Sequence, residues 1–184
     1  EDLFFLSNGH ISPVYYSVLA RSGFFPVEEL QTFRLLDSRL QGHPTTHEKL
    51  PGVRIASGSL GQGMSVALGA AAAKKLNQDN SLIYSLHGDG ELQEGQNWEA
   101  ILYAGSKGVD NLIATIDVNG KQIDGSTDDV LHMGDLQEKF QAFGWKVITI
   151  KDGNDISSII DGLNQAKKET NNGKPICVLL HTEM

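Results

Sequence analysis

Short apolar runs alternate along the chain with longer segments in which apolar residues recur at helical spacing. The runs are six residues long and rich in Ile, Leu and Val, so they are typical of buried strands. Strands that alternate with helices favour an α/β fold, with a mainly parallel central sheet and helices on both faces. Each strand is apolar enough for a central position. The expected strands are 81–86, 111–116, 145–150 and 175–180, and the expected helices are 62–76, 96–105, 136–143 and 156–170, the last with Asp155 as its N-cap.

The first fifty residues have a less regular pattern. Ser12-Pro13 suits a helix N-cap followed by proline in the first turn, and predicts a helix over 14–20. A second short helix is expected after Pro26. The segment 119–135, rich in Gly and Asp, is the longest expected loop, and long loops in compact domains often carry function.

Composition narrows the class of protein. A chain of 184 residues with 40% hydrophobic content can bury a substantial core, and it suits a single domain over 1–184 better than two. The net charge of −8 and the dispersed Lys and Arg residues argue against a nucleic-acid partner. No apolar run approaches the roughly 20 residues of a membrane-spanning helix, so we expect a soluble cytoplasmic protein with no membrane partner. The single cysteine, Cys177, lies in an apolar run and is expected to be a buried structural thiol.

Oxygen-bearing side chains follow two of the predicted strands directly. Gly88-Asp89-Gly90 places a carboxylate at the C-terminal end of one strand, where open α/β sheets bind ligands, and Gly90 can offer an unhindered N–H to a phosphate. Asn119 follows the next strand, 30 positions after Asp89, so a right-handed crossover can bring both side chains to one edge. Read alone, each is more often an ordinary turn residue. Together they favour Mg²⁺ or Ca²⁺ over zinc, with phosphates completing the coordination.

The sequence around these residues resembles the transketolases, which use thiamine diphosphate and a divalent metal. Gly88-Asp89-Gly90 followed by Asn119 looks like the thiamine-diphosphate motif. The resemblance covers nearly the whole chain and implies the diphosphate-binding domain, or the matching subunit of a split transketolase. The blocks similar to transketolases are 6–10, 42–44, 58–63, 88–95, 98–100 and 138–145.

The resemblance also implies a role for each matching position. The metal would be held by Asp89, Asn119 and the backbone carbonyl of Lys121. Gly90 would contact the diphosphate, His10 would lie near the diphosphate and thiazolium, and His43 would contact the hydroxyl groups of the donor sugar. The remaining implied residues are Gly58 and Leu60 at the cofactor rings, and Glu94 and Glu99 in an acidic network near a dimer interface.

Plainer interpretations of the same residues stay open. A lone loop histidine is usually a surface residue, and an acidic pair near a helix start is commonly only favourable placement in the helix dipole. Gly58 also suits simple entry into the helix that follows. His87, next to the metal motif, is expected to point away from it and to form structural hydrogen bonds.

Transketolases of the pentose phosphate pathway move a two-carbon ketol unit from a ketose phosphate to an aldose phosphate. The resemblance therefore implies sugar phosphates as substrates, and thiamine diphosphate with Mg²⁺, or alternatively Ca²⁺ or Mn²⁺, as cofactors. In the family a glutamate from another domain acts on the pyrimidine ring, and nothing in this sequence matches it. We therefore expect a domain truncated at both ends, without the pyrimidine-binding and C-terminal domains. It would be inactive alone and active with a complementary chain, as a homodimer or heterotetramer.

Other functions are compatible with parts of the pattern. A non-catalytic binding or scaffold module with the same fold would need no turnover, although the intact Asp89, Asn119, His10 and His43 argue against it. Another thiamine-diphosphate enzyme, such as dihydroxyacetone synthase or deoxyxylulose phosphate synthase, fits the segment 91–95 less well than transketolase does. A nicotinamide-binding Rossmann domain is disfavoured, because the glycines at 58, 61 and 63 lack the G-x-G-x-x-G spacing.

Overall fold

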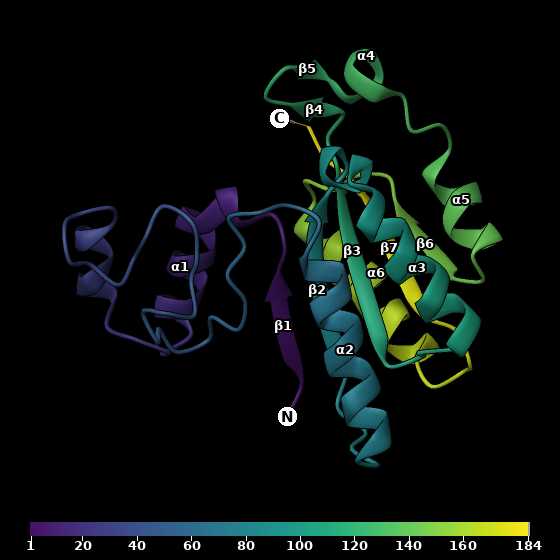
Figure 1. The fold of residues 1–184 in the computed structure, drawn as a ribbon, viewed down its shortest axis with the longest axis horizontal. Helices are drawn as coiled ribbons and strands as arrows, with labels where there is room; N and C mark the ends of the chain where they lie inside the picture. The colour runs from purple at the N-terminus through teal and green to yellow at the C-terminus, as the bar shows by residue number, and fades with distance from the viewer. Residues whose placement is uncertain (184) are drawn as a thin grey trace.

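The computed structural model describes residues 1–183 and contains a five-stranded parallel sheet in the order β1-β2-β3-β7-β6 (Figure 1). All four predicted strands are confirmed, with ends shifted by at most two residues. The apolar run at the N-terminus, for which no strand was predicted, forms a fifth at one edge. The expectation that every predicted strand is central is wrong for β6, which forms the other edge. The strands are β1 Leu3–Leu6, β2 Ile83–Gly88, β3 Leu112–Val118, β6 Lys146–Ile150 and β7 Ile176–His181.

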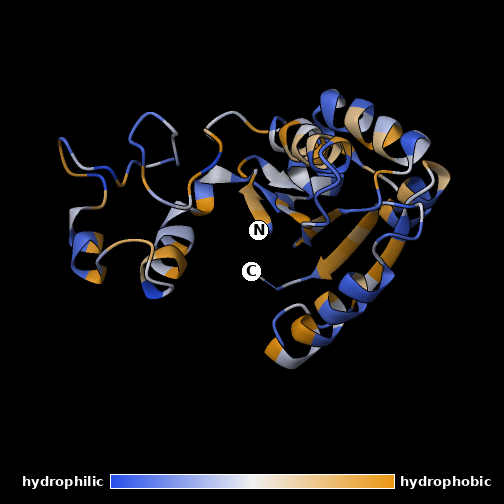
Figure 2. Ribbon diagram, turned by 90° about the horizontal axis from the view of Figure 1, so that it is seen from below, coloured by the Kyte–Doolittle hydropathy of each residue, from blue (hydrophilic) through white to orange (hydrophobic). Residues whose placement is uncertain are grey.

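Helices cover both faces of this sheet, as predicted. Figures 1 and 2 show α2 and α3 across one face and α6 on the other, with apolar residues concentrated along the strands between them. Each face of the sheet has its own apolar core, and alternate residues of β3 pack into one or the other. Leu112 packs toward α2 and α3, and Ile113 packs toward α6. Asp155 caps α6 as expected, because its carboxylate accepts a hydrogen bond from the Ser158 N–H at 2.7 Å. The helices are α2 Gly63–Leu76, α3 Gly95–Lys107, α5 Leu136–Ala142 and α6 Ile156–Glu169.

The N-terminal segment before α2 packs beside β1 around a smaller core of its own (Figure 1). It contains the helix α1 Ser12–Arg21, and the short helix expected after Pro26 is a 3-10 helix. Ser12 is the first residue of α1 rather than its cap, because its backbone is already helical, with φ −48° and ψ −38°. Its hydroxyl donates to the Gly42 carbonyl at 2.7 Å. That bond ties α1 to the loop that carries His43.

The segment 119–135 is more ordered than the loop we expected. It forms an antiparallel hairpin of two short strands and a one-turn helix, which lie over the C-terminal ends of β2 and β3 (Figure 1). Gly120 begins the hairpin with a φ of 69°, which glycine adopts without strain. The elements are β4 Lys121–Gln122, β5 Gly125–Ser126 and α4 Thr127–Leu131.

Cys177 is fully buried, as expected for a structural thiol. Within residues 1–183, no helix combines the length and the apolar character needed to cross a bilayer.

Two helical glycines offer a matched test of this packing. A Cβ at Gly105 of α3 would overlap the Phe143 carbonyl oxygen, whereas a Cβ at Gly69 of α2 would meet nothing within 4 Å. We expect Gly105→Ala to lower the free energy of unfolding by about 1–3 kcal/mol despite the better helix propensity of alanine. Gly69→Ala should raise it by roughly 0.5–1 kcal/mol. Urea unfolding followed by circular dichroism measures both, and a Gly105→Ala protein as stable as the parent would contradict the close approach of α3 to Phe143.

Candidate functional site

A cavity of about 590 Å³ opens at the C-terminal ends of β1, β2 and β3. Four parts of the chain line it: residues 8–10 after β1, His43 with residues 57–60 before α2, residues 88–94 after β2 and residues 117–124 after β3. The carboxyl ends of neighbouring parallel strands are where open α/β sheets bind ligands. The expected edge of the sheet therefore does carry a cavity.

The structure brings nine of the ten predicted site residues to this cavity. The exception is Glu99, which lies exposed on α3, outside the lining. Glu94 lines the cavity at the start of α3 but is also exposed to solvent. The nine are His10, His43, Gly58, Leu60, Asp89, Gly90, Glu94, Asn119 and Lys121.

Asp89 joins the ends of β2 and β3. Its side chain is 5% exposed and accepts hydrogen bonds from the N–H groups of Gly90 and Gly120, each at 2.8 Å. The Gly90 N–H, which we expected to face a phosphate, is therefore directed at Asp89. Burial, reinforced by the nearby Asp117 carboxylate, raises the pKa of Asp89 above its usual value, and the two N–H groups offset this only in part. A cation at this carboxylate would favour its ionised form.

The side chain of Asn119 is oriented by Asp117. Its amide nitrogen donates to Asp117 Oδ2 at 3.0 Å, and its Oδ1 accepts from the Lys121 N–H at 2.9 Å. Thr182 holds the other oxygen of Asp117. The Asn119 amide therefore presents its oxygen, not its nitrogen, on the side away from Asp117, as a cation ligand must.

The cavity wall also contains buried polar atoms that a ligand could satisfy. Within residues 1–183, Asn8 Oδ1, Ser57 Oγ and Gln122 Oε1 are buried and have no hydrogen-bond partner. Buried polar groups are rarely left unpaired, because each unmade hydrogen bond costs about 1–3 kcal/mol. The Ser57 hydroxyl can donate to a phosphate oxygen, whereas the two amide oxygens accept and suit a ligand N–H, a ligand O–H or a cation. The sequence did not reveal any of the three, since only the folded chain places them beside the cavity.

The oxygen atoms available as metal ligands fit a hard divalent cation that shares its coordination with a phosphate. Carboxylate and amide oxygens suit such a cation, and phosphate oxygens commonly supply the remaining ligands. Among the described residues, no group of three or more His, Cys, Asp or Glu side chains could hold a metal ion by itself. A cation bound at Asp89 and Asn119 would therefore need further oxygens.

The histidines divide into two kinds. His10 and His43 are exposed at the cavity, and the Cβ of His43 packs near Gly58. His87 is fully buried away from the cavity lining and hydrogen bonds through Nε2 to Ser85 Oγ at 2.9 Å. This agrees with the structural role expected for His87.

Glu91 is a site residue that the sequence patterns did not single out. Its side chain is 3% exposed and contacts Ser7, Gly61 and Gly88. Burial favours the neutral acid, but the contact with His87 and the hydrogen bonds from Ser7 and Gly61 outweigh it and hold the pKa of Glu91 below its usual value. The residue is an ionised carboxylate inside the cavity wall. A sequence pattern alone does not distinguish it from an exposed acid in a first helical turn.

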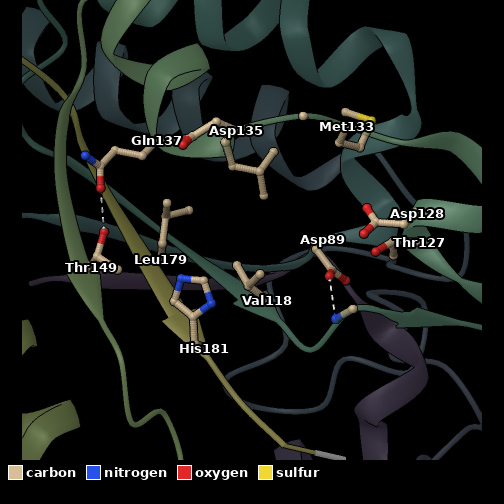
Figure 3. Close-up of a pocket in the computed structure, with 13 residues that line it drawn as sticks. Asp89, Val118, Thr127, Asp128, Met133, Asp135, Gln137, Thr149, Leu179 and His181 are labelled. Atoms are coloured by element: carbon tan, nitrogen blue, oxygen red, sulfur yellow. Dashed lines mark hydrogen bonds between the residues drawn. The ribbon is translucent and has the colours of Figure 1, made fainter.

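A second pocket of about 360 Å³ lies next to the first and shares Asp89 with it. Figure 3 shows His181 and Leu179 of β7 on one side of this pocket and Asp128 and Thr127 on the other. Asp89 thus stands in a wall common to both cavities.

Comparisons with known proteins give the family directly. A family model described as transketolase, thiamine diphosphate binding domain, matches residues 1–184. The chain is 44% identical over 182 residues to one subunit of the apulose-4-phosphate transketolase of Actinobacillus succinogenes, covering 99% of this chain and 64% of that protein. It is 41% identical over 182 residues to the 6-deoxy-6-sulfo-D-fructose transketolase subunit SqwG of a Clostridium species, covering 99% of this chain and 65% of that protein.

Solved structures of transketolases support the same family. The transketolase of Pichia stipitis in complex with sedoheptulose-7-phosphate matches with a TM-score of 0.90 at 36% identity, over 98% of this chain and 28% of that one. The chain thus spans less than two thirds of the length of the two subunit relatives and little more than a quarter of that transketolase. The resemblance in the sequence blocks and the predicted parallel α/β fold are both confirmed. The chain belongs to the transketolase family, as a thiamine-diphosphate-binding domain.

Proposed function

We propose that this chain supplies the metal and diphosphate side of a transketolase active site. With a complementary chain it would transfer a two-carbon ketol unit from a ketose phosphate to an aldose phosphate. The observation that carries the proposal is the cavity that Asp89 and Asn119 line together with the unpaired polar atoms of Asn8, Ser57 and Gln122. The names of the relatives support sugar phosphates as the substrate class, since one belongs to an apulose-4-phosphate transketolase and another was solved with sedoheptulose-7-phosphate.

Asp89 and Asn119 would hold Mg²⁺ through their side-chain oxygens, with the backbone carbonyl of Lys121 as a further ligand. Asp117 keeps the Asn119 oxygen available, and Gly120 keeps the Asp89 carboxylate in place. Gly90 lets the diphosphate approach the backbone because it has no side chain. Mg²⁺ suits this arrangement because it binds proteins through few carboxylates and shares its coordination with phosphates.

Bound thiamine diphosphate supplies the carbon nucleophile that such a transfer requires. Leu60 would pack against its rings and exclude water, and Gly58 would leave room for them. His10 would lie near the diphosphate and thiazolium, and His43 would contact the hydroxyl groups of the donor sugar. Both are exposed at the cavity, where they could bind oxygens or assist proton movements. Glu94 and Glu99, both exposed near the start of α3, would face the complementary chain.

The two named subunit relatives suggest how the work is divided. Each is described as one subunit of a transketolase, so each acts with at least one other chain. By analogy, we place the glutamate that acts on the pyrimidine ring on a complementary chain. The assembled enzyme would then be a heterotetramer, or a homodimer where both parts belong to one polypeptide.

The metal site can be tested by calorimetry. We expect Asp89→Asn, which removes the charge but keeps the shape, to weaken Mg²⁺-dependent binding of thiamine diphosphate by about 100-fold or more. Asp161→Asn makes the same chemical change on the exposed face of α6 and should leave binding unchanged. Equal affinities of the Asp89→Asn and parent proteins would rule out Asp89 as a ligand. If the parent chain binds no cofactor, with or without a complementary chain, a scaffold role is favoured instead.

The division of labour can be tested by turnover. We expect the purified chain with Mg²⁺, thiamine diphosphate, a ketose phosphate and an aldose phosphate to form no product. Adding the complementary chain should restore transfer of the two-carbon unit, whereas that chain alone should remain inactive. Chromatography of the sugar phosphates measures the outcome. Product formed by this chain alone would contradict the proposal.

A further inference from the structure

The Glu91 carboxylate connects three separate segments in the wall of the cavity. Its Oε1 accepts hydrogen bonds from the Ser7 hydroxyl and, at 2.8 Å, from the Gly61 N–H. Its Oε2 accepts from the Gly88 N–H at 3.2 Å. Ser7 in turn accepts from the Gly63 N–H at 3.1 Å, which extends the network into the first turn of α2.

Each connected segment delivers different residues to the cavity. Ser7 lies just before Asn8 and His10, and Gly61 follows the loop that carries Gly58 and Leu60. Gly88 directly precedes Asp89. The buried Glu91 side chain thus links the loop of Gly58 and Leu60, assigned to the cofactor rings, to the turn of Asp89, assigned to the metal.

The chemistry of the network requires a carboxylate. All three partners are donors, and an ionised carboxylate only accepts, so every hydrogen bond is made. A glutamine would place an amide N–H opposite one of these donors and lose at least one bond. The backbone of α2 also packs closely on this network: a Cβ at Gly63 would overlap the Ser7 side chain. His87 Nδ1 lies 3.7 Å from Glu91 Oε2, too far for a good hydrogen bond.

We propose that Glu91 is a positioning residue that sets the distance between the ring-binding loop, residues 58–61, and the metal-binding turn, residues 88–90. The inference rests on the proposed function, because it assigns those two segments to opposite ends of thiamine diphosphate. A ligand that touches both ends depends on their spacing, whereas one that touches only the turn does not. Both carboxylate oxygens of Glu91 are occupied within the protein, so it acts through its neighbours rather than on the cofactor itself.

The test compares two ligands on one variant. Calorimetry with Mg²⁺ measures the affinity of the full chain for thiamine diphosphate and for inorganic diphosphate, with the complementary chain present where binding needs it. For Glu91→Gln we expect the affinity for thiamine diphosphate to fall roughly 10- to 100-fold and the affinity for inorganic diphosphate to fall much less. Glu138→Gln, the same change on an exposed residue of α5, should alter neither. Equal losses for both ligands, or no loss, would overturn the proposal.

A second measurement does not depend on ligand binding. Amide hydrogen exchange at Gly61 and Gly88 should be slow in the parent chain and faster in Glu91→Gln, while amides in the centre of β3 are unchanged. Ser7→Ala removes a single donor and should accelerate exchange less, which keeps the test available if Glu91→Gln fails to fold. Unchanged exchange at both glycines would refute the network. If the parent chain shows slow exchange at Gly61 and Gly88 but binds no thiamine diphosphate, the proposed function is refuted and the network around Glu91 still stands.

Discussion

The site depends on the parallel pairing of β2 with β3, in which Gly88 lies opposite Asp117. This register makes the Asp89 N–H donate to the Asp117 carbonyl at 3.0 Å, and it brings the Asp89 carboxylate to the Gly120 N–H. A shift by one residue would turn every side chain of a strand to the opposite face. Apolar residues pack on both faces of β3, so such a shift would also disrupt both cores. The packing of the sheet therefore fixes the position of the candidate metal ligands.

Much of this framework follows from the sequence because its signals are local. Six-residue apolar runs and helical periodicity predicted the four later strands and the main helices, and the 30-residue spacing placed Asp89 near Asn119. What the sequence could not supply depends on contacts between distant segments. Whether β6 lies at the centre or the edge is decided by strand order. The short hairpin in 119–135 is local, but no apolar run marks it, and the Thr127 N–H closes it by donating to the Gly120 carbonyl at 3.0 Å.

The buried polar atoms illustrate the same limit within the site. Glu91 is bonded to residues 84 and 30 positions earlier in the chain, so no short motif reveals its partners. Asn8, Ser57 and Gln122 come from three segments and share only their place at one cavity. The family resemblance implied ten site residues, of which nine line this cavity, and the structure then added the residues that hold them in place. Glu99 shows the reverse case, because it belongs to a matching block and yet lies outside this cavity.

Unpaired polar atoms in a cavity wall lower the stability of the empty chain, and a ligand that satisfies them recovers that stability on binding. Binding and folding of this part of the chain are therefore coupled. The coupling is strongest where the wall is held by few contacts. The loop 58–61 belongs to no helix or strand. Side chains attach it: Glu91 accepts from the Gly61 N–H, and Gln96 donates to the Leu60 carbonyl at 3.5 Å. The turn at Asp89, by contrast, continues a central strand of the sheet. The proposed metal end of the site is therefore held by the sheet, whereas the proposed ring end depends on a side-chain network that a mutation can loosen without unfolding the sheet.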